Sequence, residues 1–371
     1  MEAQQILNVE QGYSELDAYL KKNGCRVILL VCGSSIQKFK IGSYFEGLEE
    51  REGIKVIRFS EFEPNPVYES VVKGVEIFKK EHCDMIAAVG GGSAMDVAKC
   101  IKLFSNLDSS KNYLEQRILP NNTRLIVMPT TAGTGSEATK FAVLYYKGEK
   151  QSITDGSCIP SAIMFDPSVL KTLPVYQKKA TMMDAFCHAV ESFWSVHSTN
   201  ESRRYSEQAI RQILKHKDGY LANTEIGNAS MLQAARIAGK AINLTQTTAG
   251  HAMCYKLTGL YQIAHGHAAA LCVSKLFPYM IEHTDQCADK RGTEYLNGMF
   301  QKLGRIMGCS NAKEAGRKLE YLMEELNLDA PAANENEIFV LNASVNPIRL
   351  KNNPVKLDYK AIDYLYRLIL N

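Results

Sequence analysis

Asp184 and His188 have the residue types and the spacing of metal ligands. They lie four positions apart in the apolar segment MDAFCHA, so a helix would place both side chains on one face. A buried, unpaired carboxylate is unfavourable, and a metal ion removes that penalty. Two more histidines follow, in the pairs Gly250-His251 and His265-Gly266. Three imidazoles and one carboxylate suit Fe²⁺ or Zn²⁺ rather than Mg²⁺ or Ca²⁺, although each residue could instead be a hydrogen-bonded core residue.

The remaining histidines are weaker candidates. His267 lies two positions after His265, so on a helix it points to a different side, and we interpret it as lining a pocket rather than binding the ion. The others lie in polar segments typical of a surface: His82, His197, His216 and His283.

Two glycine-rich loops could bind phosphate. The apolar run Met85–Val89 leads into GGGS at 90–93, and the run 125–128 leads into PTTAGTGSE at 129–137. A glycine turn before a helix exposes backbone N–H groups to an anion. The first loop has neither the GxGxxG nor the Walker spacing, so a simple tight turn is the alternative there. In the second loop the alternative is a helix cap at Thr134 or Ser136. On neighbouring parallel strands the two loops would form a dinucleotide cleft.

The elements that would position these residues fall into two halves. Short β-branched runs at 27–31, 55–59, 85–89, 124–128 and 162–165 alternate with helical periodicity, for example at 71–78, which predicts a parallel sheet flanked by helices. A hairpin is expected at 141–153. Beyond residue 166 the periodicity is helical, at 180–194, 202–214, 230–244 and 268–281. We therefore expect an α/β nucleotide-binding domain at 1–166 and an all-α domain at 167–371.

Composition excludes several classes of function. The chain has 371 residues, is 46% hydrophobic and carries a net charge of +3. No basic run indicates a nucleic-acid binder, and no apolar stretch of about 18 residues predicts a membrane helix. Ten cysteines without a CxxC pair and an N-terminus unlike a signal peptide favour reduced thiols in a cytoplasmic protein.

At this point the chain resembles the iron-containing (group III) alcohol dehydrogenase family. The matching motifs are GGGSAMDVAK at 90–99, MPTTAGTGSEAT at 128–139, DAFCHAVESFWS at 184–195 and GHAMCYKLTGLYQIAHGHAAAL at 250–271. They span the chain in the family's order. The resemblance implies a Rossmann-like N-terminal domain plus a helical domain, as in the dehydroquinate synthase-like fold, and often a homodimer.

The resemblance also implies site residues. The metal ligands would be Asp184, His188, His251 and His265, holding Fe²⁺, with Zn²⁺ as the alternative. NAD(P)H would be bound at Gly91, Gly92, Ser93, Asp96, Thr130, Thr131, Thr134, Thr139 and Lys150. Family members transfer a hydride between this cofactor and a primary alcohol or its aldehyde.

Two departures from the family pattern bear on mechanism and cofactor choice. Tyr255 stands where many members have a second histidine, so Tyr255, His267 or water would supply the proton. The segment 31–35 lacks the acidic residue that meets the adenine ribose in many NAD-preferring members. A 2′-phosphate would not be repelled there, so NADPH is plausible.

Within the family, the chain is most similar to the phosphonoacetaldehyde reductases. The similar segments are EPNP at 63–66, HAMCYKLTGLY at 251–261 and the run at 344–357. A phosphonate needs cationic partners, and Lys256 and Arg349 are the candidates. The predicted reaction is reduction of phosphonoacetaldehyde to 2-hydroxyethylphosphonate. The alternatives are another short aldehyde, alcohol or diol, and a dehydroquinate synthase-type lyase.

Overall fold

The computed structural model describes residues 4–9 and 12–370, and its contacts divide the chain into two compact units. The first unit ends at Leu173, and the second begins at Pro174 and also contains Ala132–Gly135. The 3-10 helix Pro167–Thr172 belongs to the first unit. The boundary between the two units therefore lies a few residues beyond residue 166, where the sequence analysis expected it.

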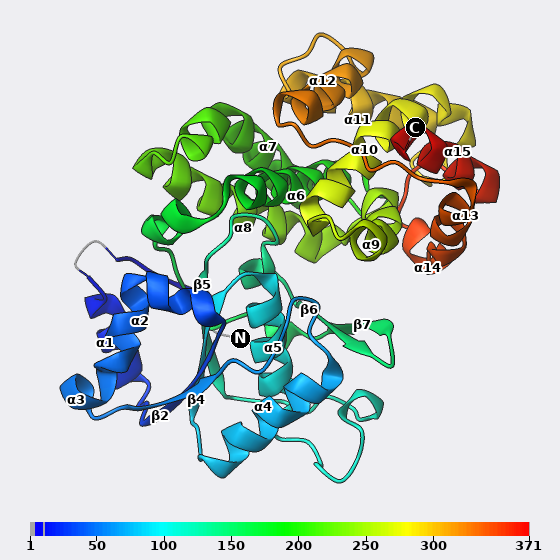
Figure 1. Ribbon diagram of the computed structural model, residues 1–371. Coiled ribbons are helices and arrows are strands. Elements are labelled where there is room, and N and C mark those ends of the chain that lie inside the picture. Colours follow the sequence, from blue (N-terminus) through cyan, green and yellow to red (C-terminus); the bar gives the residue numbers. More distant parts are fainter. Residues whose placement is uncertain (1–3, 10–11, 371) are drawn as a thin grey trace. The chain divides into compact units, whose positions relative to one another are not determined.

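A parallel sheet forms the first unit (Figure 1). Its strand order is β1-β8-β5-β4-β2-β3, and every neighbouring pair is parallel. The bounds are β1 (Gln5–Leu7), β2 (Val27–Cys32), β3 (Lys55–Phe59), β4 (Met85–Gly90), β5 (Arg124–Pro129) and β8 (Ala162–Met164). The five predicted strands are confirmed. The edge strand β1 was missed, because three residues are too few to show a periodic pattern.

The order of the strands puts the glycine loop at a reversal of chain direction across the sheet. The chain passes from β2 outward to β3 and then crosses back to β4 on the other side of β2. Ligands of open parallel sheets bind beside the carboxyl ends of strands at such a point. All six residues of β4 are buried, as expected for a strand covered on both faces. The helices of this unit are α1 (Ser14–Lys22), α2 (Lys40–Glu46), α3 (Leu48–Glu52), α4 (Tyr68–Lys80) and α5 (Gly92–Phe104).

The predicted hairpin is also present. Strands β6 (Phe141–Tyr146) and β7 (Glu149–Thr154) are antiparallel. The two turn residues, Lys147 and Gly148, have φ values of 52° and 78°, which is the left-handed pair that a type I′ hairpin turn requires.

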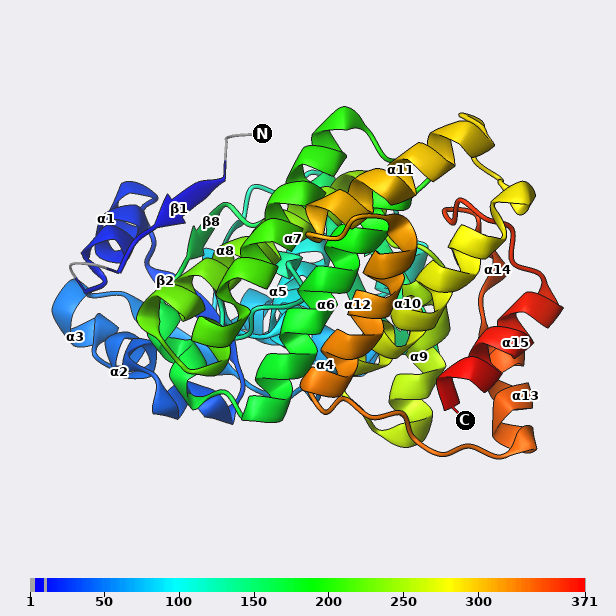
Figure 2. The ribbon, with the colours of Figure 1, turned by 90° about the horizontal axis from the view of Figure 1, so that it is seen from above.

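The second unit is built of helices. Their bounds are α6 (Val175–Trp194), α7 (Asn200–Leu221), α8 (Glu225–Thr245), α9 (Ala249–Tyr261), α10 (His265–Glu282), α11 (Thr293–Ile306), α12 (Ala312–Glu325), α13 (Glu335–Ser344), α14 (Pro347–Leu350) and α15 (Tyr359–Leu370). Helix α6 packs against α7, α8 and α10, and α9 and α10 lie side by side (Figure 2). Every residue from Met182 to Trp194 is buried, so α6 forms the core of this unit.

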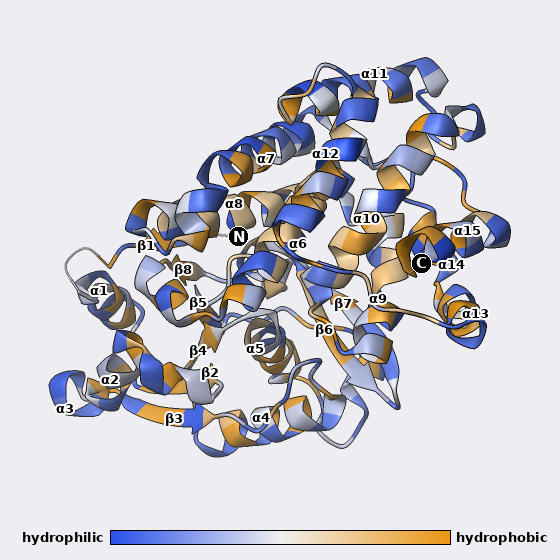
Figure 3. Ribbon diagram, turned by 45° about the horizontal axis from the view of Figure 1, so that its top comes forward, coloured by the Kyte–Doolittle hydropathy of each residue, from blue (hydrophilic) through white to orange (hydrophobic). Residues whose placement is uncertain are grey.

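The helices of the second unit differ in hydropathy. Helices α7 and α11 carry many hydrophilic residues, whereas α9 shows mainly apolar ones (Figure 3). Among the described residues, no helix combines the length and apolar character needed to cross a membrane. None of the ten cysteines, all of which lie in the described residues, forms a disulfide, and all except Cys287 are buried.

Candidate metal centre and cofactor loops

Helix α6 holds the predicted Asp–His pair in the interior of the second unit. Asp184 is 2% exposed and His188 is 6% exposed. Their facing atoms, Asp184 Oδ1 and His188 Nε2, are 3.9 Å apart. The helical spacing of four therefore brings both side chains to one buried face, as the sequence predicted.

His251 enters the same region from the start of α9. Its Nε2 lies 3.4 Å from Asp184 Oδ1, and its ring stacks on that of His188 with centroids 4.4 Å apart. The preceding Gly250 permits this approach, because a Cβ there would lie 2.5 Å from Val273 Cγ2 and 3.1 Å from Glu191 Oε1.

His265 begins α10 beside these residues. Its ring centroid is 5.5 Å from that of His251, and its Nδ1 is 3.7 Å from Cys254 Sγ. A Cβ on Gly266 would lie 2.0 Å from the Ala180 carbonyl oxygen. Glycine at that position therefore lets α10 begin directly against α6.

The donor atoms fit a divalent ion. One ligating atom from each of Asp184, His188 and His251 lies within 4.8 Å of the other two. Four-coordinate zinc has ligands at about 2.1 Å, so tetrahedral ligands are roughly 3.4 Å apart. The two distances from Asp184 Oδ1 approach this value. His265 lies alongside but outside this group of three.

Burial and neighbouring charges shift the pKa values of the cluster in different directions. Burial alone would raise the pKa of Asp184, but the nearby His188, His251 and His265 hold that pKa well below its usual range. Burial lowers the pKa of His188 to about 4. The pKa of His251 is raised to about 9 despite burial, because Glu191 and Asp184 face it.

Sequence reasoning missed Glu191, which lies one helical turn after His188. It is fully buried, and its Oε2 contacts His251 Nδ1. Burial would raise the pKa of Glu191, but contacts with His251 and Thr248 lower it. The available signal was a carboxylate within an otherwise apolar helix, since such a group requires a partner.

His267 faces other partners. It is buried, and its Nδ1 is 3.1 Å from the Tyr176 hydroxyl, which also accepts a hydrogen bond from the Ala264 N–H. Burial lowers its pKa. These contacts help to hold the start of α10, and its role in proton transfer stays a prediction.

Tyr255 joins Arg349 to the histidine cluster. Its ring stacks on His265, with centroids 5.6 Å apart at 16°. Arg349 Nη1 donates to the Tyr255 hydroxyl at 3.2 Å, and its guanidinium carbon lies 5.0 Å from the ring centroid. Arg349 is carried by the short helix α14, whose start is capped by the Asn346 side chain. Lys256, by contrast, is exposed.

The glycine loop and the hydroxyl-rich loop lie side by side in the first unit. Gly90 pairs with Pro129 across β4 and β5, and the Thr130 N–H donates to the Gly90 carbonyl at 3.0 Å. A Cβ at Gly91 would lie 3.3 Å from Thr131 Oγ1. The two loops therefore lie on neighbouring strands, as predicted.

Helix α5 begins directly after this turn. Gly92 and Ser93 form its first two positions, and no acidic residue lies in its first turn. The N–H groups of these positions have no partner within the helix. Their partial positive charge suits a phosphate.

A buried lysine, to which the sequence analysis assigned no role, holds the second loop. Lys99 on α5 is fully buried. Its Nζ donates to the Ser136 carbonyl at 2.6 Å, the Thr139 carbonyl at 3.0 Å and the Phe141 carbonyl at 2.8 Å. The hydroxyls of Ser136 and Thr139 are also within 2.9 and 3.2 Å. The Thr139 hydroxyl is therefore engaged by Lys99.

Asp96 and Lys150 lie close to this cluster. Ser136 Oγ donates to Asp96 Oδ1 at 3.1 Å. Burial raises the pKa of Asp96 to about 6, against opposing effects of Lys99 and Lys150. Lys150 is on β7, opposite Tyr145. Its charge is thus near enough to act on Asp96.

Thr134 belongs to a segment that groups with the second unit. It groups there because the flanking residues Gly133 and Gly135 lie very close to helices α6 and α8. Gly135 has φ of 60°, and a Cβ there would lie 2.5 Å from Gly239 Cα, while one at Gly133 would lie 2.8 Å from Thr181.

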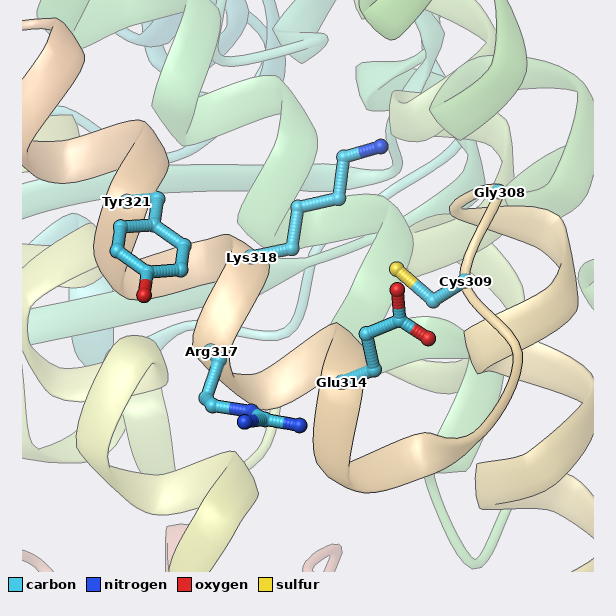
Figure 4. A pocket seen from close by; sticks show the side chains of 6 residues that line it. All are labelled: Gly308, Cys309, Glu314, Arg317, Lys318 and Tyr321. Carbon is cyan, nitrogen blue, oxygen red and sulfur yellow. The ribbon is translucent and has the colours of Figure 1, made fainter.

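A surface hollow of about 400 Å³ lies at the junction of α11 and α12 (Figure 4). Its lining comprises Gly308, Cys309, Glu314, Arg317, Lys318 and Tyr321. The Lys318 ammonium donates to the Met307 carbonyl at 2.8 Å. None of the candidate metal ligands contributes to this hollow.

Two family models cover nearly the whole chain. The model for iron-containing alcohol dehydrogenase matches residues 3–167. The model for the C-terminal part of the Fe-containing alcohol dehydrogenase family matches residues 178–368.

The names of individual relatives refer to different substrates. Choline dehydrogenase of Bacillus subtilis is 28% identical over 94% of this chain and 89% of its own length. Phosphonoacetaldehyde reductase of Streptomyces viridochromogenes is 30% identical over 76% of this chain and 75% of its own. The crystal structure of sulfoacetaldehyde reductase from Bifidobacterium kashiwanohense in complex with NAD⁺ has a TM-score of 0.88 at 25% identity, covering 99% of this chain and 97% of that one.

Proposed function

Because the chain belongs to the iron-containing alcohol dehydrogenase family, we propose that it reduces phosphonoacetaldehyde to 2-hydroxyethylphosphonate with NAD(P)H. The oxidoreductase class follows from the family. The choice of substrate rests on Arg349, whose guanidinium contacts Tyr255 beside His265.

Asp184, His188, His251 and His265 are the proposed ligands of Fe²⁺, with Zn²⁺ as the alternative. When bound, such an ion polarises a carbonyl oxygen and stabilises the developing alkoxide. The burial of Asp184, His188 and His251 limits access of water to these three side chains. The proposed NAD(P)H contacts are the residues of the two loops with their neighbours: Gly91, Gly92, Ser93, Asp96, Thr130, Thr131, Thr134, Thr139 and Lys150.

The chain's own residues would orient the aldehyde and supply a proton. Arg349 would bind the phosphonate oxygens, since a guanidinium pairs with two oxygens of such a group at once. The Tyr255 oxygen accepts from Arg349 and its hydroxyl retains a proton that it can donate. Tyr255 is therefore the proposed proton donor, and His267 is the weaker candidate because its Nδ1 is engaged by Tyr176.

The positive charge of Arg349 also discriminates among the alternative substrates. A cation beside the site disfavours choline, which is itself a cation, and favours an acidic aldehyde. A sulfonate presents similar oxygens, so sulfoacetaldehyde is the second candidate. A neutral aldehyde or diol would make no use of Arg349.

The turn after β2 supports NADPH as a cofactor. It contains Gly33, Ser34 and Ser35 without an acidic residue. Arg58 Nη2 lies 3.4 Å from the Gly33 carbonyl oxygen, so a cation is present at this end of the strand. We expect a higher kcat/KM with NADPH than with NADH.

A substrate panel with two variants tests the proposal. Arg349→Met should lower kcat/KM for phosphonoacetaldehyde by about 10- to 100-fold, the usual effect of losing a charge-assisted hydrogen bond. The rate with butanal should change little. Lys351→Met is the matched control, because Lys351 is an exposed cation two positions after Arg349, and it should leave both rates close to wild type.

Several outcomes would contradict the assignment of phosphonoacetaldehyde as the substrate. Equal losses on both aldehydes would show that Arg349 does not recognise the anion, and faster turnover of sulfoacetaldehyde would assign the sulfonate. Product formation without consumption of NAD(P)H would instead indicate a lyase.

A further inference from the structure

The carboxylate of Glu191 uses both oxygens as acceptors toward the start of α9. Oε1 accepts the Thr248 N–H at 3.0 Å, the Thr248 hydroxyl at 2.6 Å and the His251 N–H at 3.3 Å. Oε2 contacts His251 Nδ1. The Thr248 hydroxyl also accepts from Trp194 Nε1 at 2.9 Å, which directs its own proton toward Glu191.

These contacts determine the tautomer of His251. An ionised carboxylate can only accept hydrogen bonds, so His251 Nδ1 must carry a proton. A neutral ring then has its lone pair on Nε2, the atom that lies 3.4 Å from Asp184 Oδ1. We propose that Glu191 is a positioning residue that keeps His251 in its metal-binding tautomer and balances the charge of the ion. This inference rests on the proposed metal centre.

The charge balance follows from the donor set. With neutral imidazoles, Asp184 supplies one negative charge against the two positive charges of Fe²⁺ or Zn²⁺. Glu191 supplies the second, so the buried centre is neutral only when Glu191 is ionised. An uncompensated charge beside side chains as buried as Asp184, His251 and Glu191 is strongly unfavourable. His265 differs in this respect, because the neighbour of its Nδ1 is the Cys254 thiol.

A purely structural role is the competing explanation, since Glu191 also holds the N-terminus of α9. The Glu191→Gln variant separates the two. Three donors converge on Oε1, so the glutamine carbonyl should occupy that position and its NH₂ group should face His251. Nδ1 must then accept a hydrogen bond, which moves the proton to Nε2, and His251 can no longer bind a metal through that atom.

Metal affinity is therefore the decisive measurement. Metal-free wild type and Glu191→Gln are titrated with Zn²⁺ against a chelator of known affinity, and Co²⁺ spectra report the coordination geometry. We expect Glu191→Gln to raise the Kd by about 100-fold, at the upper end of the effect of losing a partner of a metal-bound histidine. Its Co²⁺ spectrum should lose the tetrahedral bands.

Ser192→Ala is the matched control. Ser192 is the next residue on α6, is fully buried and accepts from the Thr245 hydroxyl at 2.9 Å. It should lower thermal stability while leaving the Kd for Zn²⁺ unchanged.

The outcomes separate this inference from the proposed function. Failure of wild type to bind Zn²⁺ or Co²⁺ would overturn the metal centre itself. Wild-type binding with a Kd changed less than threefold in folded Glu191→Gln would overturn only the role of Glu191. If that variant does not fold, Glu191→Asp decides. Its shorter side chain cannot reach Thr248 and His251 together, so a rise in Kd of about tenfold supports the role and an unchanged Kd refutes it.

Discussion

Replacing Lys99 by methionine should loosen the second cofactor loop. The Lys99 ammonium has three protons and faces five oxygens of Ser136, Thr139 and Phe141 at 2.6–3.2 Å. Methionine fills a similar volume without donating to any of them. The buried oxygens would then lack their donor, which costs more than the hydrogen bonds themselves contribute.

The expected loss is about 3 kcal/mol. Hydrogen bonds to a charged group contribute about 1.5–3 kcal/mol each. Three such bonds are offset in part because the lysine no longer has to be desolvated. For a domain of this size, 1 kcal/mol corresponds to roughly 2–4 °C in Tm. Thermal unfolding should therefore show a decrease of roughly 10 °C in the Tm of the first unit.

Cofactor binding distinguishes this effect from general damage. Lys99→Met should also weaken the binding of NADPH, because Ser136 and Thr139 belong to the proposed cofactor loop. A fluorescence titration measures the change in Kd. The control is Lys178→Met. Lys178 is equally buried, and its Nζ donates to Tyr220, Asn223 and Asn228 in the second unit. It should lower Tm without changing the Kd for NADPH. An unchanged Tm and an unchanged Kd in Lys99→Met would refute the reasoning.

Three further predictions concern pH, close packing and the ion. The pKa of Asp96 is about 6, above that of an unfolded chain, so the folded state binds the proton more tightly. The unfolding free energy of the cofactor-free protein should therefore decrease as the pH rises from about 4 to 6. Asp96→Asn should remove this dependence on pH. An increase in the unfolding free energy as the pH rises over this range would contradict the prediction. Gly135→Ala should destabilise the protein by more than about 2 kcal/mol, because φ is 60° and the added Cβ would lie 2.5 Å from Gly239 Cα. Gly259→Ala, with open space around it, should stabilise α9 by about 0.5–1 kcal/mol; chemical denaturation measures both, and similar changes would argue against the packing. Removing divalent ions with a chelator should abolish activity until Fe²⁺ or Zn²⁺ is added, whereas full activity in metal-free protein would exclude the metal mechanism.

Some residues acquire their function only through partners distant in sequence. Glu191 has its partners 57 and 60 residues later, and the sequence offered no pattern that joins them. Thr139 and His267 stay predictions, and each has a partner that its position in the sequence does not reveal. Lys99 Nζ donates to the Thr139 hydroxyl, and the Tyr176 hydroxyl contacts Nδ1 of His267.

The sequence determined the elements and the local geometry of the metal ligands. Helical spacing alone places Asp184 and His188 on one face, and β-branched runs followed by glycine turns indicate parallel strands with ligand loops. These are properties of neighbouring residues, so the local pattern is sufficient. Tertiary structure decided which helix begins against which side chain. Gly250 and Gly266 admit α9 and α10 to the face of α6, and that packing brings His251 and His265 to Asp184.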